Sequence, residues 1–505
     1  MGHEIDPEFD GLPLAALADA ALGRCRELGV EHADVRVHRV RSQVVRLRDG
    51  RPEGATDADD VGLAVRVVQG GSWGFAAAAD LTPDEAARIA GEAVSMAALS
   101  RPLSTEHVEL APEEVYPNAR YVSDYEIDPT TVSEADKAAV LAEWSRELLA
   151  ADGVDHVDAS VFAVKENVFY ADLAGTTTTQ QRVRIEPDVT LVGIDHESGA
   201  FETMRTLAPP AGRGWEYVTG DRATGWDWAR ELAELPELLR ERLAAPSIEP
   251  GTYDLVIDPS NLWLTIHESI GHATELDRAL GYEANYAGTS FATFDKLGDL
   301  RYGSELMHVV GDRTTPFGLS TVGYDDEGVA AQSWDIVRDG VLVGYQLDRN
   351  MARLKGLGRS NGCAYADSAQ HFPIQRMANV SLQPVSGGPV TADLISGVED
   401  GLLVVGDKSW SIDMQRYNFQ FTAQRFYRIH GGRLAGQVKD AAYQANTTDF
   451  WGAMSNVGGP ETFVLGGAFN CGKGQPGQVA SVSHGCPAAL FRGINVLNTV
   501  QEAGR

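Results

Sequence analysis

The chain contains little cysteine: four residues in 505, namely Cys25, Cys363, Cys471 and Cys486. They are scattered and show no paired spacing, which argues against a disulfide framework and favours a reducing compartment such as the cytoplasm. In that compartment, a cysteine that takes part in chemistry is usually a metal ligand or a nucleophile.

Long apolar runs are also missing. No stretch approaches the roughly 18 apolar residues that a membrane-spanning helix needs. The first residues, MGHEIDPEFDG, lack the basic and apolar segments of a secretory signal. We therefore expect a cytoplasmic protein that has no membrane partner.

Basic residues are scarce relative to acidic ones. Lysine and arginine total 42 against 72 aspartate and glutamate residues, which gives a formal charge of −30. Such a surface repels phosphate backbones and anionic lipids, so nucleic acids and membranes are poor partners. The remaining composition, 43% hydrophobic and 23% charged, is typical of a globular protein, and the length predicts two or three domains.

The element signals predict an α+β fold with two main domains. Residues 1–245 mix capped helix starts with alternating strand segments, such as those at 34–40 and 44–47, and form an α+β domain with two possible lobes, about 1–112 and 113–245. A proline-bearing run at 244–251 marks the boundary. Residues 246–505 are predicted to be a β-rich domain that carries one metal-binding helix.

A short segment occurs twice in the N-terminal half. Gly-Val-Glu-His-Ala-Asp at 29–34 and Gly-Val-Asp-His-Val-Asp at 153–158 each follow a predicted helix and precede two alternating segments. The pattern favours either a duplicated helix–strand–strand unit or a convenient helix-to-strand turn used twice.

The most informative motif lies in the helix predicted over Asn261–Leu280. His267, Glu268 and His272 form an H-E-x-x-x-H pattern, with the histidines at i and i+5. On an ideal α-helix these side chains point about 140° apart, so they share a metal only if the helix is widened by a π-bulge, most readily at Gly271. If the pattern is a coincidence on a partly exposed helix, the helix should be straight.

A catalytic zinc needs three protein ligands and one open position. Two would come from this helix, and the third must come from elsewhere in the chain. The residue types alone leave several candidates: Cys471, Cys486, His484, His371 and acidic residues such as Glu275.

Several ordered motifs together resemble the TldD/PmbA metallopeptidase family, and specifically its metal-bearing, TldD-type subunit. The resemblance covers most of the chain. It is carried by Gly62–Arg66 with Gly74–Ala76, His267–His272, Asp325–Gly328, Gly344–Tyr345 with Asp348–Arg349, Ala352–Arg353, His371–Asn379 and Cys471–Lys473.

This resemblance implies roles for individual residues. His267, His272 and Cys471 would hold Zn²⁺, and Glu268 would act as the general base and acid. His371 and Arg376 lie in a family-like run, so they are our candidates for substrate binding and for stabilising the oxyanion.

The resemblance also implies a zinc-dependent peptidase for short, extended or unfolded peptides, including leader segments of ribosomally made natural products. A β-rich domain with open edges holds such substrates by strand addition. The implied partner is a TldE-type subunit in a heterodimer, or a second copy in a homodimer. Two alternatives stay open: a zinc amidohydrolase for a small natural product, and a non-catalytic interaction subunit.

Overall fold

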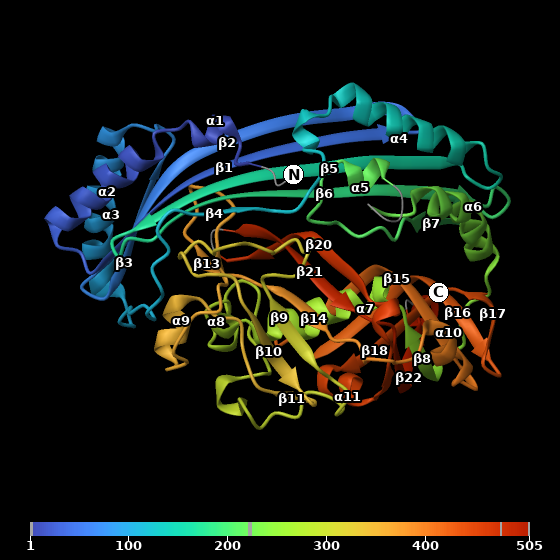
Figure 1. Ribbon diagram of the computed structural model, residues 1–505. Coiled ribbons are helices and arrows are strands. Elements are labelled where there is room, and N and C mark those ends of the chain that lie inside the picture. The colour runs from blue at the N-terminus through green and yellow to red at the C-terminus, as the bar shows by residue number, and fades with distance from the viewer. Residues whose placement is uncertain (1–3, 221–224, 475–476, 503–505) are drawn as a thin grey trace.

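The computed structural model describes residues 4–220, 225–474 and 477–502. It confirms the α+β class: a long, curved sheet with helices at both ends lies over a strand-rich C-terminal region (Figure 1). Among the described residues, no helix is long and apolar enough to cross a membrane.

The N-terminal half builds its sheet from two units with the same order of elements. Helix α2 precedes β1 and β2, and helix α4 precedes β5 and β6, which is the order that the repeated segment suggested. The sheet runs β3-β2-β1-β5-β6, and both β4 and β7 pair with β6. The elements of this half are α1 (Pro7–Asp10), α2 (Leu14–Leu28), β1 (His32–Arg48), β2 (Arg51–Gln69), β3 (Ser72–Ala78), α3 (Pro83–Ser100), β4 (Ala119–Val122), α4 (Glu134–Leu149), β5 (His156–Asp172), β6 (Thr177–Ile194), β7 (Phe201–Arg205), α5 (Glu216–Thr219) and α6 (Trp228–Ala244).

Strand β1 is longer than its apolar alternation predicts. The two short segments expected at 34–40 and 44–47 are parts of one continuous strand that pairs with β2 and β5. Ion pairs support the polar stretch: Arg39 contacts Asp59 at 2.6 Å, and Arg41 contacts Asp57 at 2.8 Å. Cross-strand pairs of opposite charge thus support the pairing of β1 with β2 where apolar residues are few.

The C-terminal half is organised around strands that pair in a closed ring, β15-β8-β22-β18-β16 and back to β15. A large apolar cluster fills this region and includes Phe421, Tyr443 and Trp451. The elements of this half are β8 (Gly251–Ile257), α7 (Pro259–Ile266), α8 (Leu276–Ala279), β9 (Val309–Asp312), β10 (Ser333–Arg338), β11 (Val341–Leu342), α9 (Arg349–Leu354), β12 (Ala364–Tyr365), β13 (Ile374–Gln375), β14 (Asn379–Leu382), α10 (Thr391–Ser396), β15 (Asp400–Ile412), β16 (Asn418–His430), β17 (Arg433–Val438), β18 (Ala441–Asn446), α11 (Thr447–Gly452), β19 (Met454–Val457), β20 (Val464–Lys473), β21 (Gln478–Cys486), β22 (Ala489–Asn498) and α12 (Thr499–Glu502).

Two kinds of contact join the halves. The β20–β21 hairpin lies directly under the long sheet (Figure 1), where Phe469 packs on Phe162 of β5 with ring centroids 4.9 Å apart. Buried arginines add ion pairs: Arg36 contacts Asp326 at 2.6 Å, and Arg66 contacts Glu327 at 2.9 Å. The hairpin and the segment that carries Asp326 and Glu327 therefore attach the C-terminal half to the N-terminal sheet. The domain division at 245/246 stays a prediction.

Candidate metal centre

The segment that carries His267 and His272 is not one continuous α-helix over 261–280. Helix α7 begins at a cap in which Asp258 accepts a hydrogen bond from the Ser260 backbone N–H at 3.0 Å. The α-helical geometry ends at Ile266, and a π-helical turn follows over His267–Gly271. A 3₁₀ turn over His272–Thr274 and the separate helix α8 complete the segment. The widened turn is the distortion that an i, i+5 histidine pair requires.

Local packing and hydrogen bonds stabilise this turn. A Cβ on Gly271 would lie 2.5 Å from the Met377 sulfur, so a larger residue there would displace the Met377 side chain. Two carbonyls of the turn find side-chain donors: Gln346 Nε2 donates to Gly271 O at 2.7 Å, and Thr274 Oγ1 donates to Ile270 O at 2.8 Å. The backbone groups that the widened turn frees are thereby partnered in the interior.

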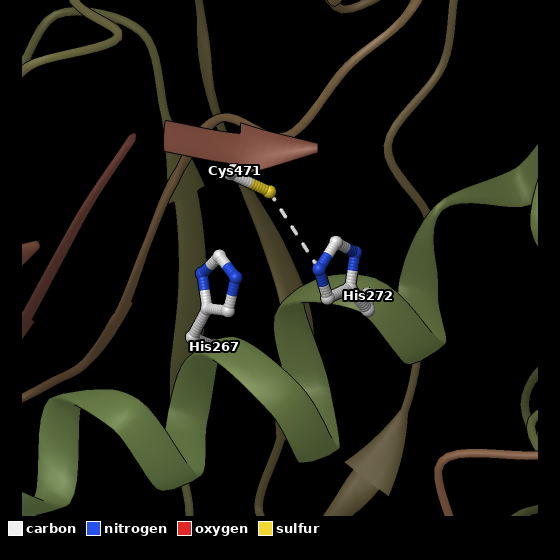
Figure 2. A group of neighbouring side chains, drawn as sticks. All are labelled: His267, His272 and Cys471. Atoms are coloured by element: carbon white, nitrogen blue, oxygen red, sulfur yellow. Dashed lines mark hydrogen bonds between the residues drawn. The ribbon is translucent and has the colours of Figure 1, made fainter. Parts of the chain in front are cut away.

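Three ligand-type side chains converge above the π turn. One atom each of His267, His272 and Cys471 lies within 4.8 Å of the other two, and Cys471 Sγ is 3.6 Å from His272 Nε2. Figure 2 shows both imidazoles rising from the same side of the helix toward the cysteine on β20. In tetrahedral zinc sites with metal–ligand bonds of about 2.0–2.3 Å, neighbouring ligand atoms lie about 3.5 Å apart. The donor set fits such an ion, and the Cys471–His272 distance matches this spacing. With three protein ligands, a bound ion would keep one position for water or substrate.

A buried carboxylate, itself paired with a lysine, orients His272. Its Nδ1 lies 2.8 Å from Glu275 Oε2, while Lys473 Nζ donates to Glu275 Oε1 at 3.0 Å. Although burial alone would raise the pKa of Glu275, the charges of Lys473, His272 and Arg278 hold it well below its usual range. An ionised carboxylate only accepts, so His272 donates from Nδ1 and directs Nε2 toward Cys471.

His267 has a different partner. Its Nδ1 lies 2.8 Å from Nε2 of His484 on β21, and His484 Nδ1 lies 2.9 Å from the carbonyl of Val380. Burial, with His267 beside it, lowers the pKa of His484 well below its ordinary value, so this ring is neutral. His484, one of the candidates for the third ligand, lies behind His267 and not in the group of three.

The structure separates the two rival cysteines. Burial tends to raise the pKa of the Cys471 thiol, but His272 and Arg376 bring it below its ordinary value. Burial and the charge of Asp258 raise the pKa of Cys486 well above that value, and its sulfur faces the Pro259 carbonyl at 3.8 Å. Only Cys471 combines thiolate character with proximity to the histidines.

Glu268 lies beside the group of three and pairs with a residue that the sequence did not point to. Its Oε2 accepts from Arg416 Nη1 at 2.5 Å. Although Glu268 is buried, His272, His267 and Arg416 hold the pKa of its carboxyl below the usual range. Arg416 lies in the turn between β15 and β16 with a positive φ of 62°. Its role depends on a long-range contact, so no local motif could have signalled it.

A cleft of about 550 Å³ gives access to the site. It lies between the N-terminal sheet and β20, and His267, Glu268, His272 and Cys471 line its floor. In the described part of the chain β20 pairs with β21 alone, so its other edge has no strand beside it. Residues of β6, β7 and β15 form the other walls, among them Glu186, Asp188, Arg205, Asp407 and Trp410.

The structure does not place the two predicted substrate-binding residues at this cleft. Arg376 is buried behind β20, where it donates to the carbonyls of Cys471 and Gln478. His371 lies 2.6 Å from Asp367 and is half-buried. Neither residue lines the cleft around Glu268. Their substrate role stays a prediction, whereas the observed contacts of Arg376 hold the strand that bears Cys471.

Sequence comparisons identify the family. Residues 250–498 match the model of the PmbA/TldA metallopeptidase C-terminal domain, and residues 33–97 match PmbA/TldA metallopeptidase domain 1. A metalloprotease of Methanothermobacter thermautotrophicus is 27% identical over 98% of this chain and 100% of its own length. A zinc metalloprotease TldD homolog of Saccharolobus solfataricus is 23% identical over 94% of this chain and 98% of its own.

Solved structures share the fold. A protein of Thermotoga maritima described as a putative modulator of a DNA gyrase superposes with a TM-score of 0.75 at 16% identity, covering 96% of this chain and 100% of its own. TldE from Thermococcus kodakarensis gives 0.71 at 15% identity, covering 95% and 99%. With matched family models over both halves of the sequence, the chain belongs to the PmbA/TldD metallopeptidase family.

Proposed function

We propose that this protein is a zinc-dependent peptidase that hydrolyses short, extended or unfolded peptides, including leader segments of ribosomally made natural products. The observation that carries the proposal is the convergence of His267, His272 and Cys471 on the floor of an open cleft, with Glu268 beside them. Two imidazoles and a thiolate favour zinc over harder ions.

Each residue of the site has a chemical role in this proposal. When bound, Zn²⁺ polarises the scissile carbonyl and makes water nucleophilic near neutral pH. Glu268 accepts a proton from the attacking water at its carboxylate and passes it to the leaving amine. Arg416 holds the Glu268 carboxylate in place and brings a positive charge to the cleft, where negative charge develops on the substrate.

The cleft suits an extended substrate. The free edge of β20 offers backbone groups to a peptide, and pairing through the main chain gives little preference for sequence. A narrow, closed pocket would have favoured an amidohydrolase for a small natural product. A site closed by four protein ligands would have favoured an interaction subunit.

We also propose a cellular location and a partner subunit for the enzyme. All four cysteines have free thiols, which supports a cytoplasmic location. The likeness to TldE supports pairing with a TldE-type subunit in a heterodimer, with a homodimer as the alternative.

Hydrolysis of an unstructured synthetic peptide, followed by mass spectrometry, tests the proposal. Zinc-loaded protein should cleave it, and a chelator should stop cleavage until zinc is returned. Glu268→Gln should retain zinc but lose about 10²–10⁴-fold in turnover. Glu197→Gln is the matched control, because Glu197 follows a histidine in the same way but is exposed. Cleavage that survives the loss of zinc, or that Glu268→Gln leaves unchanged, would refute the proposal.

A further inference from the structure

His484 is a buried histidine that no proposed step uses. It lies on β21, and its ring stacks on Trp263 of α7 with centroids 6.4 Å apart and planes 8° apart. Both of its nitrogens have a partner: Val380 O at 2.9 Å on one side and His267 Nδ1 at 2.8 Å on the other. It thus links the backbone of β14 to a residue of the candidate metal centre.

The chemistry of these partners fixes every proton in the link. A carbonyl oxygen only accepts, so His484 carries its proton on Nδ1 and donates to Val380. A neutral imidazole has one N–H, which makes Nε2 of His484 an acceptor. His267 must then donate from Nδ1, and its Nε2 keeps the lone pair that a metal ion requires.

The second histidine of the site also donates from Nδ1, but its hydrogen-bond partner is different. His272 donates from Nδ1 to the ionised Glu275, which is a carboxylate partner of a kind common in metal sites. His267 has no carboxylate at its Nδ1 in the hydrogen bonds of the described residues, and a second imidazole stands there instead. A neutral acceptor orients the ring without adding a charge beneath the site.

We propose that His484 is a positioning residue, which holds His267 in the Nδ1–H tautomer and fixes the direction of its ring through the chain from Val380 O to His484 to His267. The inference rests on the proposed function, because it concerns the same site. If the link is lost, the imidazole of His267 is free to turn or to carry its proton on Nε2, where the proton blocks metal binding. Partners of this kind typically change metal affinity by about 10–100-fold.

Packing against Trp263 is the competing explanation, and three substitutions separate the two. His484→Gln places an amide oxygen near the position of Nε2, where it accepts from His267. His484→Asn reaches Val380 but not His267. His484→Phe keeps the flat ring beside Trp263 and removes both hydrogen bonds. Cys486→Ala is the control, since it changes a buried residue of the same strand that does not contact the three ligand-type side chains.

Zn²⁺ affinity of the full chain, measured by competition with a chromophoric chelator, is the readout, with visible absorption of the Co²⁺-loaded protein as a second one. We expect His484→Phe and His484→Asn to bind Zn²⁺ about 10–100-fold more weakly and to alter the Co²⁺ spectrum. His484→Gln should recover most of the affinity, and Cys486→Ala should match the unmodified chain. Melting curves in chelator identify any variant that fails to fold.

The outcomes are distinct. Equal zinc affinity in the Gln, Asn and Phe variants would overturn the inference and leave the proposed function standing. An affinity that follows the packing volume, with Phe better than Gln, would assign His484 to the core alone. Absence of Zn²⁺ binding by the unmodified chain would refute the proposed function as well as this inference.

Discussion

The two cysteines of the β20–β21 hairpin are both buried, with exposed fractions of 5% for Cys471 and 0% for Cys486, but their surroundings differ. Cys471 faces an imidazole and has a guanidinium nearby, and these hold its thiol pKa below the ordinary value. Cys486 faces a carbonyl and a carboxylate, and its thiol pKa is raised well above that value. Burial alone therefore does not identify a ligand. The charges and lone pairs around the sulfur do.

The largest expected difference between the two cysteines is in chemical reactivity. In metal-free protein at pH 7, we expect iodoacetamide to modify Cys471 about 100-fold or more faster than Cys486, because each pKa unit changes the thiolate fraction tenfold and only Cys471 borders the cleft. Peptide mass spectrometry over a time course measures both rates. Since a lowered pKa means deprotonation at lower pH, Cys471 should react at pH values where an ordinary thiol is protonated.

Addition of zinc tests whether the fast alkylation of Cys471 comes from the metal site. Added Zn²⁺ should protect Cys471 and leave the slow rate of Cys486 unchanged, and in urea the two rates should become similar. Comparable rates in the folded, metal-free protein would show that the electrostatic difference between the two sites is absent.

A second difference concerns stability without metal. Cys486→Ala should lower the free energy of unfolding by about 1–2 kcal/mol, because it leaves a cavity in a fully buried part of the core. Cys471→Ala should cost less, below about 1 kcal/mol, because Cys471 lines the cleft, where water can take the place of its sulfur. Urea denaturation in chelator measures both, and the reverse order would contradict the comparison.

The smallest effect comes from the charge behind Cys471. Arg376→Met removes a cation that lowers the pKa of this thiol, so alkylation of Cys471 should slow by about 3–10-fold. Arg376→Lys keeps the charge and should restore much of the rate. Cys486 should be unaffected by either change, because its pKa is set by burial and Asp258. A rate that ignores charge and drops equally in both variants would assign Arg376 to positioning alone.

Much of the site was predictable because its information is local. The His267–His272 spacing predicted a widened helix if the two histidines share a metal ion, and Gly271 marked a residue of the π turn. The α+β class followed from alternating segments and capped helix starts. In contrast, residue types alone could not choose Cys471 over Cys486, because the choice depends on the register of β20 and β21 and on a contact 199 residues apart in sequence.

Other features could not be predicted because they also depend on contacts between residues far apart in the sequence. Arg416 meets Glu268 only because the β15–β16 turn folds over the π turn, a separation of 148 residues. His484 was a ligand candidate by residue type, but the pairing of its strand places it behind His267. The full length of β1 depends on ion pairs with β2, which apolar periodicity does not detect.

Zinc content tests the central claim most directly. Elemental analysis should find about one zinc per chain in the unmodified protein and in Cys486→Ala, and almost none in Cys471→Ala. This result would identify Cys471 as the third ligand. With only three protein ligands, the zinc would keep one coordination position for water or substrate. Zinc lost equally from both variants, or no zinc in the unmodified protein even after incubation with the metal, would contradict the account.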